Sequence, residues 1–415
     1  MKPAKSNSVF QLAVVVAALG YFVDIYDLLL FTIVREPSLR DLGVDMKDSV
    51  SVLAASARII NWQMIGLLIG GVFWGIIGDK RGRLSVLFGS IILYSIANFA
   101  TAFVQNTEQY AYARFVAGLG LAGELGAGIT LVSELLPKTR RGIGTSLVAG
   151  IGLFGAVFAY FTFQYTDKDW RLCYKIGGFL GIALLFLRVS VAESGMFRET
   201  KEKNISRGNI LMFLTNRYRL RKYLLAILIG LPTWFVVGIL VNYSNRFAQA
   251  FYGDNHIDSG RAIMYAYAAI AVGDIAIGLV SQYFQSRKKA LYLFYFFTIL
   301  SGILFFSGFV INDTRMYITC AALGFSTGFW AIFVTMGAEQ FGTNLRATAA
   351  TTIPNMVRGA LPLTNMLFLD LFQKNWGWTI IQSGITTGVI VMLIALLAAW
   401  RTEETFHKDL NYSEV

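Results

Sequence analysis

The sequence predicts an all-α polytopic membrane protein, with twelve transmembrane helices in two pseudo-symmetric six-helix bundles. Three observations lead to this fold class. First, 55% of the 415 residues are hydrophobic and only 15% are charged, whereas a soluble domain carries about 25% charged residues. Second, apolar runs of about 20 residues, the length that crosses a bilayer, recur along the whole chain. Third, features of the first half of the chain return in the second half.

The apolar runs are expected to be helices, because only helices and closed barrels satisfy every backbone group in lipid. Barrel strands would be about ten residues long with strict alternation of polar and apolar residues, and the runs lack that alternation. The first six predicted spans are Val9–Val34, Leu53–Gly78, Leu84–Val104, Tyr110–Leu136, Gly142–Phe163 and Leu172–Ala192. The second six are Tyr223–Tyr243, Arg261–Phe284, Ala290–Ile311, Met316–Gly337, Ala347–Phe372 and Trp378–Trp400.

Lysine and arginine are concentrated in every second connection between spans and in both tails, and this bias predicts the orientation. The basic segments are 2–5, 80–83, 138–141, 198–222, 287–289, 346 and 401–408. The opposite connections are richer in acid, for example Asp41, Asp45 and Asp48. We therefore expect a multi-pass protein of the bacterial inner membrane with both termini in the cytoplasm. This placement explains the net charge of +11 without nucleic acid as a partner.

An internal repeat divides the chain. Glu134 precedes Arg141 by seven residues, and Glu339 precedes Arg346 by seven, at an offset of 205 (339 − 134). We expect an N-terminal bundle (1–193), a basic cytoplasmic linker (194–222), a C-terminal bundle (223–400) and a cytoplasmic tail (401–415). Repeats of this kind place a substrate site between the halves, near the middle of the bilayer.

A glycine-rich basic motif follows the second span, with Gly75, Asp79, Lys80, Gly82 and Arg83 in nine residues. Gly82 permits a tight turn. Asp79 is placed in the loop between two helices, where it can accept hydrogen bonds from nearby helix N-termini, and Arg83 can pair across the seam between the halves.

This motif resembles the signature loop of the major facilitator superfamily, and the resemblance spans nearly the whole chain. Arg114–Gly118 with Gly123 and Glu124 is similar to helix four of the metabolite:proton symporters and sugar porters, and Asp24–Asp27 is similar to the first helix of metabolite:proton symporters and aromatic-acid symporters. The resemblance implies alternating access and a cytoplasmic gate latch. The gating candidates are Gly75, Asp79, Lys80, Gly82, Arg83, Glu134, Arg141, Glu339 and Arg346.

Six charged residues fall inside predicted spans, where each costs about 2.5–3.5 kcal/mol even on the lenient scale. They must pair, protonate or line a wet cavity. The six residues are Asp24, Asp27, Arg114, Glu124, Asp274 and Arg358.

The proton-coupling candidates are Asp24, Asp27 and Glu124. Asp24 and Asp27 share a helix face, and Asp27 lies at a depth comparable to that of Arg114. In sugar porters, which this region resembles, such a pair forms the proton site; the other interpretation is a purely structural ion pair. Glu124, near the middle of its span, could stay protonated until the cavity wets it.

Arg358 is the most individual of these charges, because the resemblance implies a small residue after Asn355. A cation halfway along its span favours an anionic group on the substrate. The alternative is an internal partner for Asp274. The substrate-binding candidates are Arg114, Arg358, Asp274, Asn355, Trp330 and Tyr26.

Together these features predict a secondary active transporter for a small organic anion or zwitterion of the carboxylate type, coupled to protons by symport. Proton-driven export of a metabolite or siderophore-like polycarboxylate is the alternative within transport. A membrane-embedded enzyme or receptor is a third hypothesis, which no nucleophile–base pair, metal cluster or phosphate loop supports. We expect no metal and no organic cofactor, with protons as the coupling ion. The expected partners are a small-molecule substrate and the lipid bilayer, and the expected state is a monomer.

Overall fold

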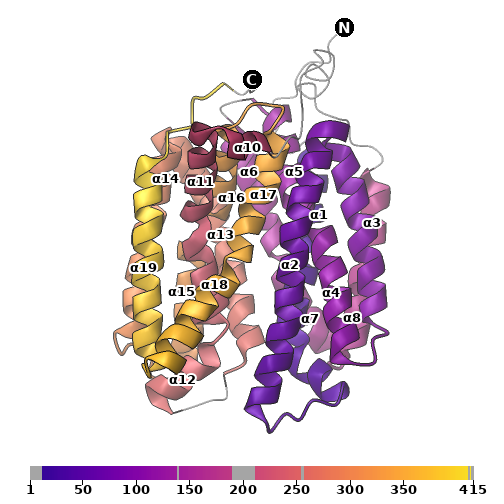
Figure 1. Cartoon of the computed structure of the whole chain (residues 1–415), viewed down its shortest axis with the longest axis vertical. Helices are drawn as coiled ribbons and strands as arrows, with labels where there is room; N and C mark the ends of the chain where they lie inside the picture. The colour runs from indigo at the N-terminus through magenta and orange to yellow at the C-terminus, as the bar shows by residue number, and fades with distance from the viewer. Residues whose placement is uncertain (1–11, 138–139, 189–210, 254–256, 410–411, 413–415) are drawn as a thin grey trace.

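A computed structural model of the chain describes residues 12–137, 140–188, 211–253, 257–409 and 412. The protein is 83% helical, and the described residues contain no strand. Most helices run side by side along one direction (Figure 1). The short helix α10 (Leu211–Thr215) lies at one end of the molecule and α12 (Ser244–Tyr252) at the other. We call these ends the α10 end and the α12 end.

The helices form two groups that follow one another along the chain (Figure 1). The first group consists of α1 (Leu12–Asp41), α2 (Ser49–Arg81), α3 (Arg83–Thr101), α4 (Thr107–Leu121), α5 (Glu124–Leu135), α6 (Arg141–Leu153), α7 (Gly155–Tyr165) and α8 (Trp170–Arg188). The second consists of α10, α11 (Arg217–Phe235), η1 (Val236–Val241), α12, α13 (Ser259–Phe284), α14 (Arg287–Phe306), α15 (Asp313–Ser326), α16 (Trp330–Glu339), α17 (Arg346–Gly359), α18 (Leu361–Asn365), η2 (Met366–Asn375) and α19 (Ile380–Arg401). We refer to these groups as the N-terminal and C-terminal halves.

Eleven helical segments of the described chain are long and apolar enough to cross a membrane. The twelfth is the continuous run of α17, α18 and η2, residues 346–375, which at 1.5 Å per residue is about 45 Å long. Its first part is polar, with Arg358 and several threonines, so this span is less apolar than the other eleven. The predicted all-helical fold with twelve spans is confirmed.

Two of the predicted spans are broken at equivalent positions. The fourth span breaks at Ala122 and Gly123, and the tenth at Thr327–Phe329; Gly123 and Gly328 lie 205 residues apart, the same offset as the sequence repeat. Both breaks bring backbones close to a neighbour. A Cβ on Gly328 would lie 2.4 Å from the carbonyl carbon of Gly273, so only glycine fits there.

Two boundaries differ from the sequence predictions. Asp79 lies inside α2, which continues to Arg81, so it is not in a loop; Gly82 alone turns the chain, with a φ of 106°. Helix α11 begins at Arg217, so residues 217–222 of the predicted linker are helical. The Asn216 side chain caps the start of α11 by accepting hydrogen bonds from Tyr218 N and Arg219 N.

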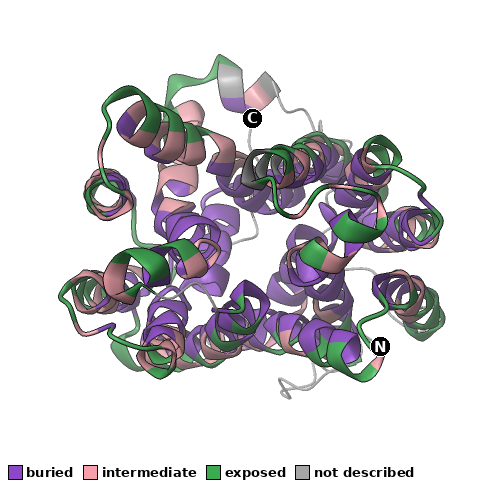
Figure 2. Cartoon of the chain, turned by 90° about the horizontal axis from the view of Figure 1, so that it is seen from below, coloured by how far each residue is buried: buried purple, intermediate pink, exposed green. Residues whose placement is uncertain are grey.

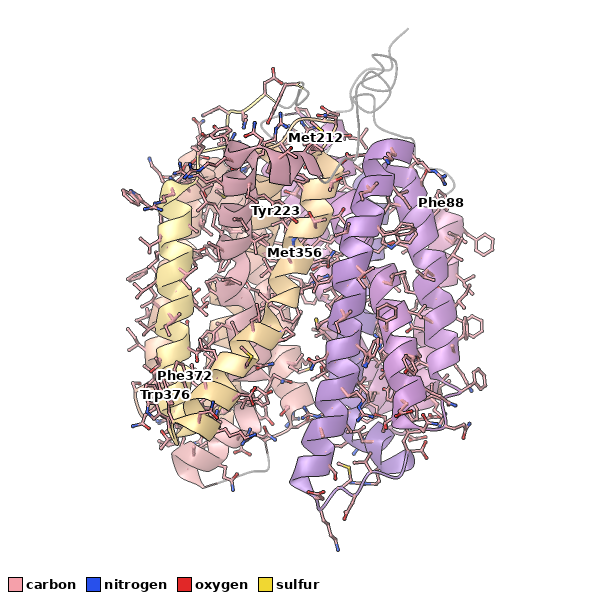
Figure 3. All side chains as sticks on the ribbon, viewed as in Figure 1. Phe88, Met212, Tyr223, Met356, Phe372 and Trp376 are labelled. Carbon is pink, nitrogen blue, oxygen red and sulfur yellow. The ribbon has the colours of Figure 1, made fainter. Side chains whose placement is uncertain are left out.

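Burial follows the expected membrane pattern. Residues at the centre, between the two halves, are buried, whereas the outward faces of the peripheral helices are exposed (Figure 2). Exposed apolar side chains include Ile96 on α3, Phe186 on α8 and Leu397 on α19, which is expected where the surrounding medium is lipid. At the α12 end, Phe372 and Trp376 lie together (Figure 3), and Trp378 stacks on Phe372. Such aromatic groups are typical of the membrane–water interface.

The segment after α19 is docked at the α10 end. The Glu404 carboxylate accepts hydrogen bonds from the Ser286 hydroxyl, from Arg287 N at 2.9 Å and from Lys288 N at 3.2 Å, and it therefore caps the first turn of α14. Burial alone would raise the pKa of Glu404, but these hydrogen bonds outweigh it and hold that pKa below 4.5. An anion at a helix N-terminus is also favoured by the helix dipole.

We expect Glu404→Gln to loosen this segment. The lowered pKa means that the ionised form contributes stability above pH 4.5, and that this stability is lost as the pH falls from 4.5 through the pKa of the folded state. Hydrogen exchange of amides 402–408, corrected for intrinsic rates, should accelerate several-fold in Glu404→Gln at pH 7, and in the unaltered chain as the pH falls below 4.5 through the pKa of the folded state. His407→Gln is the control, because His407 is an exposed residue of the same segment. Equal exchange in all three proteins at pH 7 would contradict the capping role.

Candidate functional site

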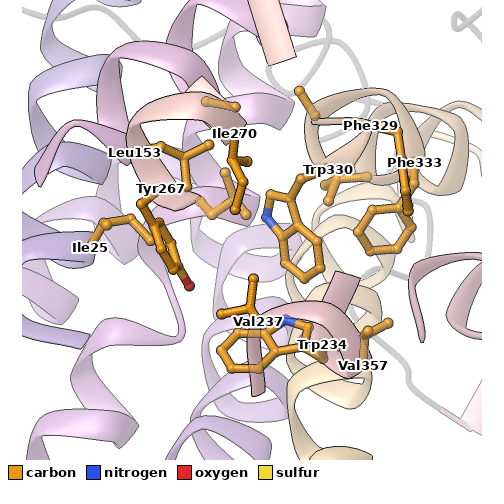
Figure 4. Close-up of a cluster of buried hydrophobic side chains, with 14 of the residues drawn as sticks. Ile25, Leu153, Trp234, Val237, Tyr267, Ile270, Phe329, Trp330, Phe333 and Val357 are labelled. Carbon is orange, nitrogen blue, oxygen red and sulfur yellow. The ribbon is translucent and has the colours of Figure 1, made fainter. Parts of the chain in front are cut away.

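The two halves meet around a small central cavity of about 20 Å³, enough for about one water molecule. Its lining comes from α1, α6, α11, α13, α16 and α17, and includes Tyr21, Trp234, Tyr267, Trp330 and Arg358. Trp234, Tyr267 and Trp330 gather around a common space in the close-up (Figure 4). The cavity is therefore aromatic, and Arg358 is the charged residue in its lining.

Arg358 is 2% exposed. Its Nη1 donates a hydrogen bond to Asn355 Oδ1 at 3.2 Å, and its guanidinium lies 5.6 Å from the centre of the Trp330 ring. Its Nε is buried and has no hydrogen-bond partner. Arg358 makes no ion pair with any residue that the structure describes. A guanidinium that does not deprotonate in proteins thus sits at the cavity with incomplete compensation.

Asp274 does not pair with Arg358, so this alternative from the sequence is wrong. The Asp274 Oδ1 instead accepts a hydrogen bond from Ala331 N at 2.9 Å, in the first turn of α16. The physical reason is the break before α16, which leaves backbone N–H groups without intrahelical partners. Asp274 caps that turn inside the C-terminal half and does not line the central cavity.

Asn355 forms a hydrogen bond at the break in the fourth span. Its Nδ2 donates to the carbonyl oxygen of Ala122 at 3.0 Å, at the end of α4. Its Oδ1 accepts from Arg358. Asn355 therefore connects the broken fourth span of the N-terminal half to the cavity cation of the C-terminal half.

Asp27 and Arg114 form an ion pair in the interior of the N-terminal half. Arg114 Nη1 lies 2.8 Å from Asp27 Oδ1 and 3.1 Å from Asn98 Oδ1, and Arg114 Nη2 donates to the Asp27 carbonyl oxygen at 3.1 Å. Both side chains are completely buried, and the guanidinium also lies 5.3 Å from the centre of the Tyr174 ring. The sequence expectation that Arg114 contacts substrate is not matched, because its donors face Asp27 and Asn98 and not the central cavity.

Three further candidates are not among the lining residues of the central cavity. The Tyr26 hydroxyl donates to the Cys173 carbonyl oxygen on α8 at 2.8 Å, because the helical period turns Tyr26 away from the face that presents Tyr21 and Ile25 to the seam. Glu124 accepts a hydrogen bond from the Ser90 hydroxyl at 2.5 Å, so it faces α3. Asp24 is completely buried on α1, within electrostatic reach of Tyr21.

The gating candidates come together at the α10 end. Asp79 Oδ1 accepts from Ala347 N at 3.1 Å, and Asp79 Oδ2 accepts from Thr348 N at 2.9 Å and from Thr348 Oγ1 at 2.6 Å. Asp79 of the N-terminal half therefore caps α17 of the C-terminal half. A Cβ on Gly75 would lie 2.9 Å from Thr348 Cα, which explains the glycine one turn earlier.

Two glutamates of the sequence repeat, Glu134 and Glu339, form ion pairs with arginines from other segments of the chain. Arg346 pairs with Glu134 of the other half at 3.3 Å, and Arg287 pairs with Glu339 at 3.3 Å. All four side chains are at least 96% buried. Lys80 is exposed, and the side chains of Arg83 and Arg141 lie outside the described residues. The Arg346–Glu134 pair crosses between the halves and closes the α10 end of the seam together with Asp79, whereas the Arg287–Glu339 pair lies within the C-terminal half.

Asp79→Asn is expected to weaken this closure. An amide keeps one acceptor oxygen, but it removes the charge that the α17 N-terminus favours and places an N–H₂ group against backbone N–H donors. We expect the transport rate to fall at least about tenfold, while substrate affinity changes by less than about threefold. Lys80→Gln, at an exposed neighbour, is the control. A normal transport rate in Asp79→Asn would show that the contact is not a latch.

Sequence reasoning missed three contributors. Tyr21 and Tyr267 line the central cavity, and Arg35 lines a second cavity described below. Tyr21, Ile25 and Leu28 follow the i, i+4, i+7 period of one helix face, so the seam-facing side of α1 could have been found from this pattern. Tyr267 and Arg35 carried no comparable signal.

Comparisons with known proteins agree with this architecture. The family model of the Major Facilitator Superfamily matches residues 12–362. A Haemophilus influenzae protein whose name assigns it to metabolite transport is 26% identical over 366 residues, 85% of this chain and 87% of that protein. The niacin transporter of Acinetobacter baylyi is 35% identical over 153 residues, 36% of this chain and 34% of its own. The solved structure of a proton:xylose symporter bound to 6-bromo-6-deoxy-D-glucose has a TM-score of 0.81, with 15% identity and 98% of both chains covered. At that identity the likeness concerns the fold alone.

Proposed function

Because the chain belongs to the major facilitator superfamily, whose members are transporters and not enzymes, we propose that it carries a small organic anion or zwitterion by proton-coupled symport. The substrate class is a carboxylate-type metabolite. The protein would span a bacterial inner membrane, with the α10 end in the cytoplasm, where the basic connections lie.

The observation that carries the substrate class is Arg358. This buried cation lies in a cavity between the two halves, and no described carboxylate forms an ion pair with it. A charge at membrane depth costs several kcal/mol unless it is compensated. A substrate carboxylate would supply the compensation, since the guanidinium fork matches a carboxylate bidentately. The niacin transporter among the relatives supports this class, because niacin is a carboxylic acid.

Proton coupling is proposed for Asp27. Its carboxylate is held by Arg114 in a fully buried pair, whereas its Oδ2 has no hydrogen-bond partner. A proton could add to that oxygen at the moment when a conformational change loosens the pair. Moving one charge through 100 mV yields about 2.3 kcal/mol, which corresponds to an approximately fifty-fold concentration gradient.

Alternating access requires the closed α10 end to open. Asp79 with Thr348 and Arg346 with Glu134 cross between the halves there, so these contacts would break when the halves rotate about the central cavity. With the α10 end closed, we propose that the central cavity opens toward the α12 end, which is the periplasmic end in this proposal.

The substrate class is tested by ligand binding to the purified protein. Acids would be paired with their amides, which lack the carboxylate charge, such as nicotinate with nicotinamide and proline with prolinamide, and scored by thermal stabilisation. A bound ligand at 100 times its Kd stabilises by about 2.7 kcal/mol. We expect at least one acid to stabilise the protein while its amide does not. Stabilisation by amides or sugars with no preference for acids would contradict the proposal.

A further inference from the structure

A second cavity lies between the two halves, nearer the α12 end. It is about 90 Å³ in volume and is lined by α1 and α2 of one half and by α11, η1, α13 and α18 of the other, with residues that connect η1 to α12. Its polar lining is dominated by Arg35 on α1 and by the amides of Asn61, Gln63, Asn242 and Asn365. No aspartate or glutamate is among its lining residues.

Arg35 is the cation of this cavity. It is mostly buried and makes no ion pair with any residue in the described part of the chain. Glu36, the next residue, is exposed at the surface and interacts with Arg35 only through longer-range electrostatics, as does the Tyr243 hydroxyl. The positive charge of Arg35 therefore faces a space that holds neutral groups.

The amides suit a bound anion. An amide offers two N–H donors without adding a charge, so it can bind a carboxylate oxygen and release it again. The Oδ1 of Asn365 is buried without a partner, which leaves this side chain incompletely satisfied. That oxygen can only accept, so a carboxylate does not satisfy it; because buried polar groups are nearly always hydrogen-bonded, a donor such as water or an O–H or N–H group of the bound acid is expected to complete this bond.

The second cavity, which we call the outer cavity, shares lining residues with the central cavity. Leu28 and Trp234 line both cavities. Arg35 lies 14 residues after Tyr21 on α1, so the two levels are about 21 Å apart along the helix axis. Two cations that form no ion pair among the described residues, Arg35 and Arg358, thus mark successive depths between the halves.

We infer that Arg35, with Asn61, Asn242 and Asn365, forms an outer anion-binding site for the carboxylate of a small organic acid. The anion stops at this site before it passes Trp234 to reach Arg358. This role in substrate capture rests on the proposed function, whereas the attraction of anions to the cavity does not.

The attraction can be measured without knowing the substrate. Asn61 is exposed in the lining, and the two native cysteines, Cys173 and Cys320, are buried. Asn61→Cys would be modified by an anionic and by a cationic methanethiosulfonate reagent, each rate normalised to that of a free thiol. We expect the anionic reagent to be favoured, and Arg35→Gln to lower the ratio of the two rates about tenfold. Arg35→Lys should keep most of the preference, because it keeps the charge.

The control is Arg40→Gln, which removes an exposed cation of α1 outside the cavity and should leave the ratio within about twofold, since exposed charges are screened. Removal of an uncompensated buried cation should not unfold the protein, which thermal unfolding of Arg35→Gln checks. An unchanged ratio in folded Arg35→Gln would overturn the inference.

A second arm separates this site from the proposed function. For an acid that the protein transports, Arg35→Gln should raise KM about tenfold at an unchanged maximal rate, because capture is impaired and the central site is intact. An unchanged KM with a changed reagent ratio would mean that the outer site binds anions but does not serve substrate. If no acid is transported at all, the proposed function fails, while the reagent ratio still tests the outer site.

Discussion

Arg358→Ala is expected to weaken the binding of carboxylate substrates at least about thirtyfold, since removal of one partner of a buried charged pair costs roughly 2–5 kcal/mol. The guanidinium is in the central cavity, and its Nε has no protein partner, so the substrate carboxylate would be its main source of compensation. Neutral amide analogues should bind Arg358→Ala no worse than they bind the unaltered chain. The measurement is the Kd of an acid and its amide for each purified protein.

Arg358→Lys should bind the acid with an affinity between those of the unaltered chain and Arg358→Ala, because a point charge does not replace a bidentate fork. The double variant Arg358→Ala with Asp274→Ala should not recover binding, because Asp274 caps α16 and does not pair with Arg358. Asp274→Ala alone is the control, and its loss should appear in stability and not in the preference for acids. Recovery of acid binding in the double variant would contradict the anion site.

Asp27→Asn is expected to abolish uphill accumulation driven by a pH gradient, while substrate exchange continues at a measurable rate. The amide still offers an oxygen to Arg114, so the hydrogen bond at 2.8 Å can form, but the group no longer takes up and releases a proton. Exchange does not require the return of an empty, deprotonated carrier. Uptake with and without a gradient, and counterflow of labelled substrate, measure the two activities in proteoliposomes.

Folding is the concern for this variant, because breaking a buried ion pair costs about 3–5 kcal/mol. Retained counterflow serves as the internal control, since an unfolded protein exchanges nothing. Asn98→Ala, which removes a neutral acceptor of Arg114, should keep uphill transport. Undiminished accumulation by Asp27→Asn would exclude Asp27 as the essential proton site and direct attention to Asp24 or Glu124.

Sequence patterns that have a single physical explanation predicted the corresponding parts of the structure. Apolar length predicted the helices, and the charge bias grouped the basic connections that meet at the α10 end. Asp79 was expected to accept from helix N-termini, and it caps α17. The partner could not be known, because Thr348 lies 269 residues away and carries no motif.

Only some of the substrate-site candidates line the central cavity, because charge and depth do not tell which face a side chain occupies. Arg358 and Trp330 line the central cavity, but Tyr26 and Arg114 point into the N-terminal half. Asp274 was linked to Arg358 because both are buried charges of the same half. The break before α16, which the sequence did not predict, supplies the backbone donors that Asp274 satisfies instead.

Measuring proton flux into proteoliposomes is the direct test of proton-coupled symport of an organic acid. Vesicles containing the protein and a pH-sensitive dye, with no initial pH gradient, would receive an acid identified by the binding screen, at a fixed membrane potential. If transport is proton-coupled symport, we expect the lumen to acidify as the acid enters, and the paired amide to cause no change. Both Asp27→Asn and Arg358→Ala should abolish the acidification. Entry of the acid without acidification, in vesicles impermeable to it when the protein is absent, would contradict proton-coupled symport.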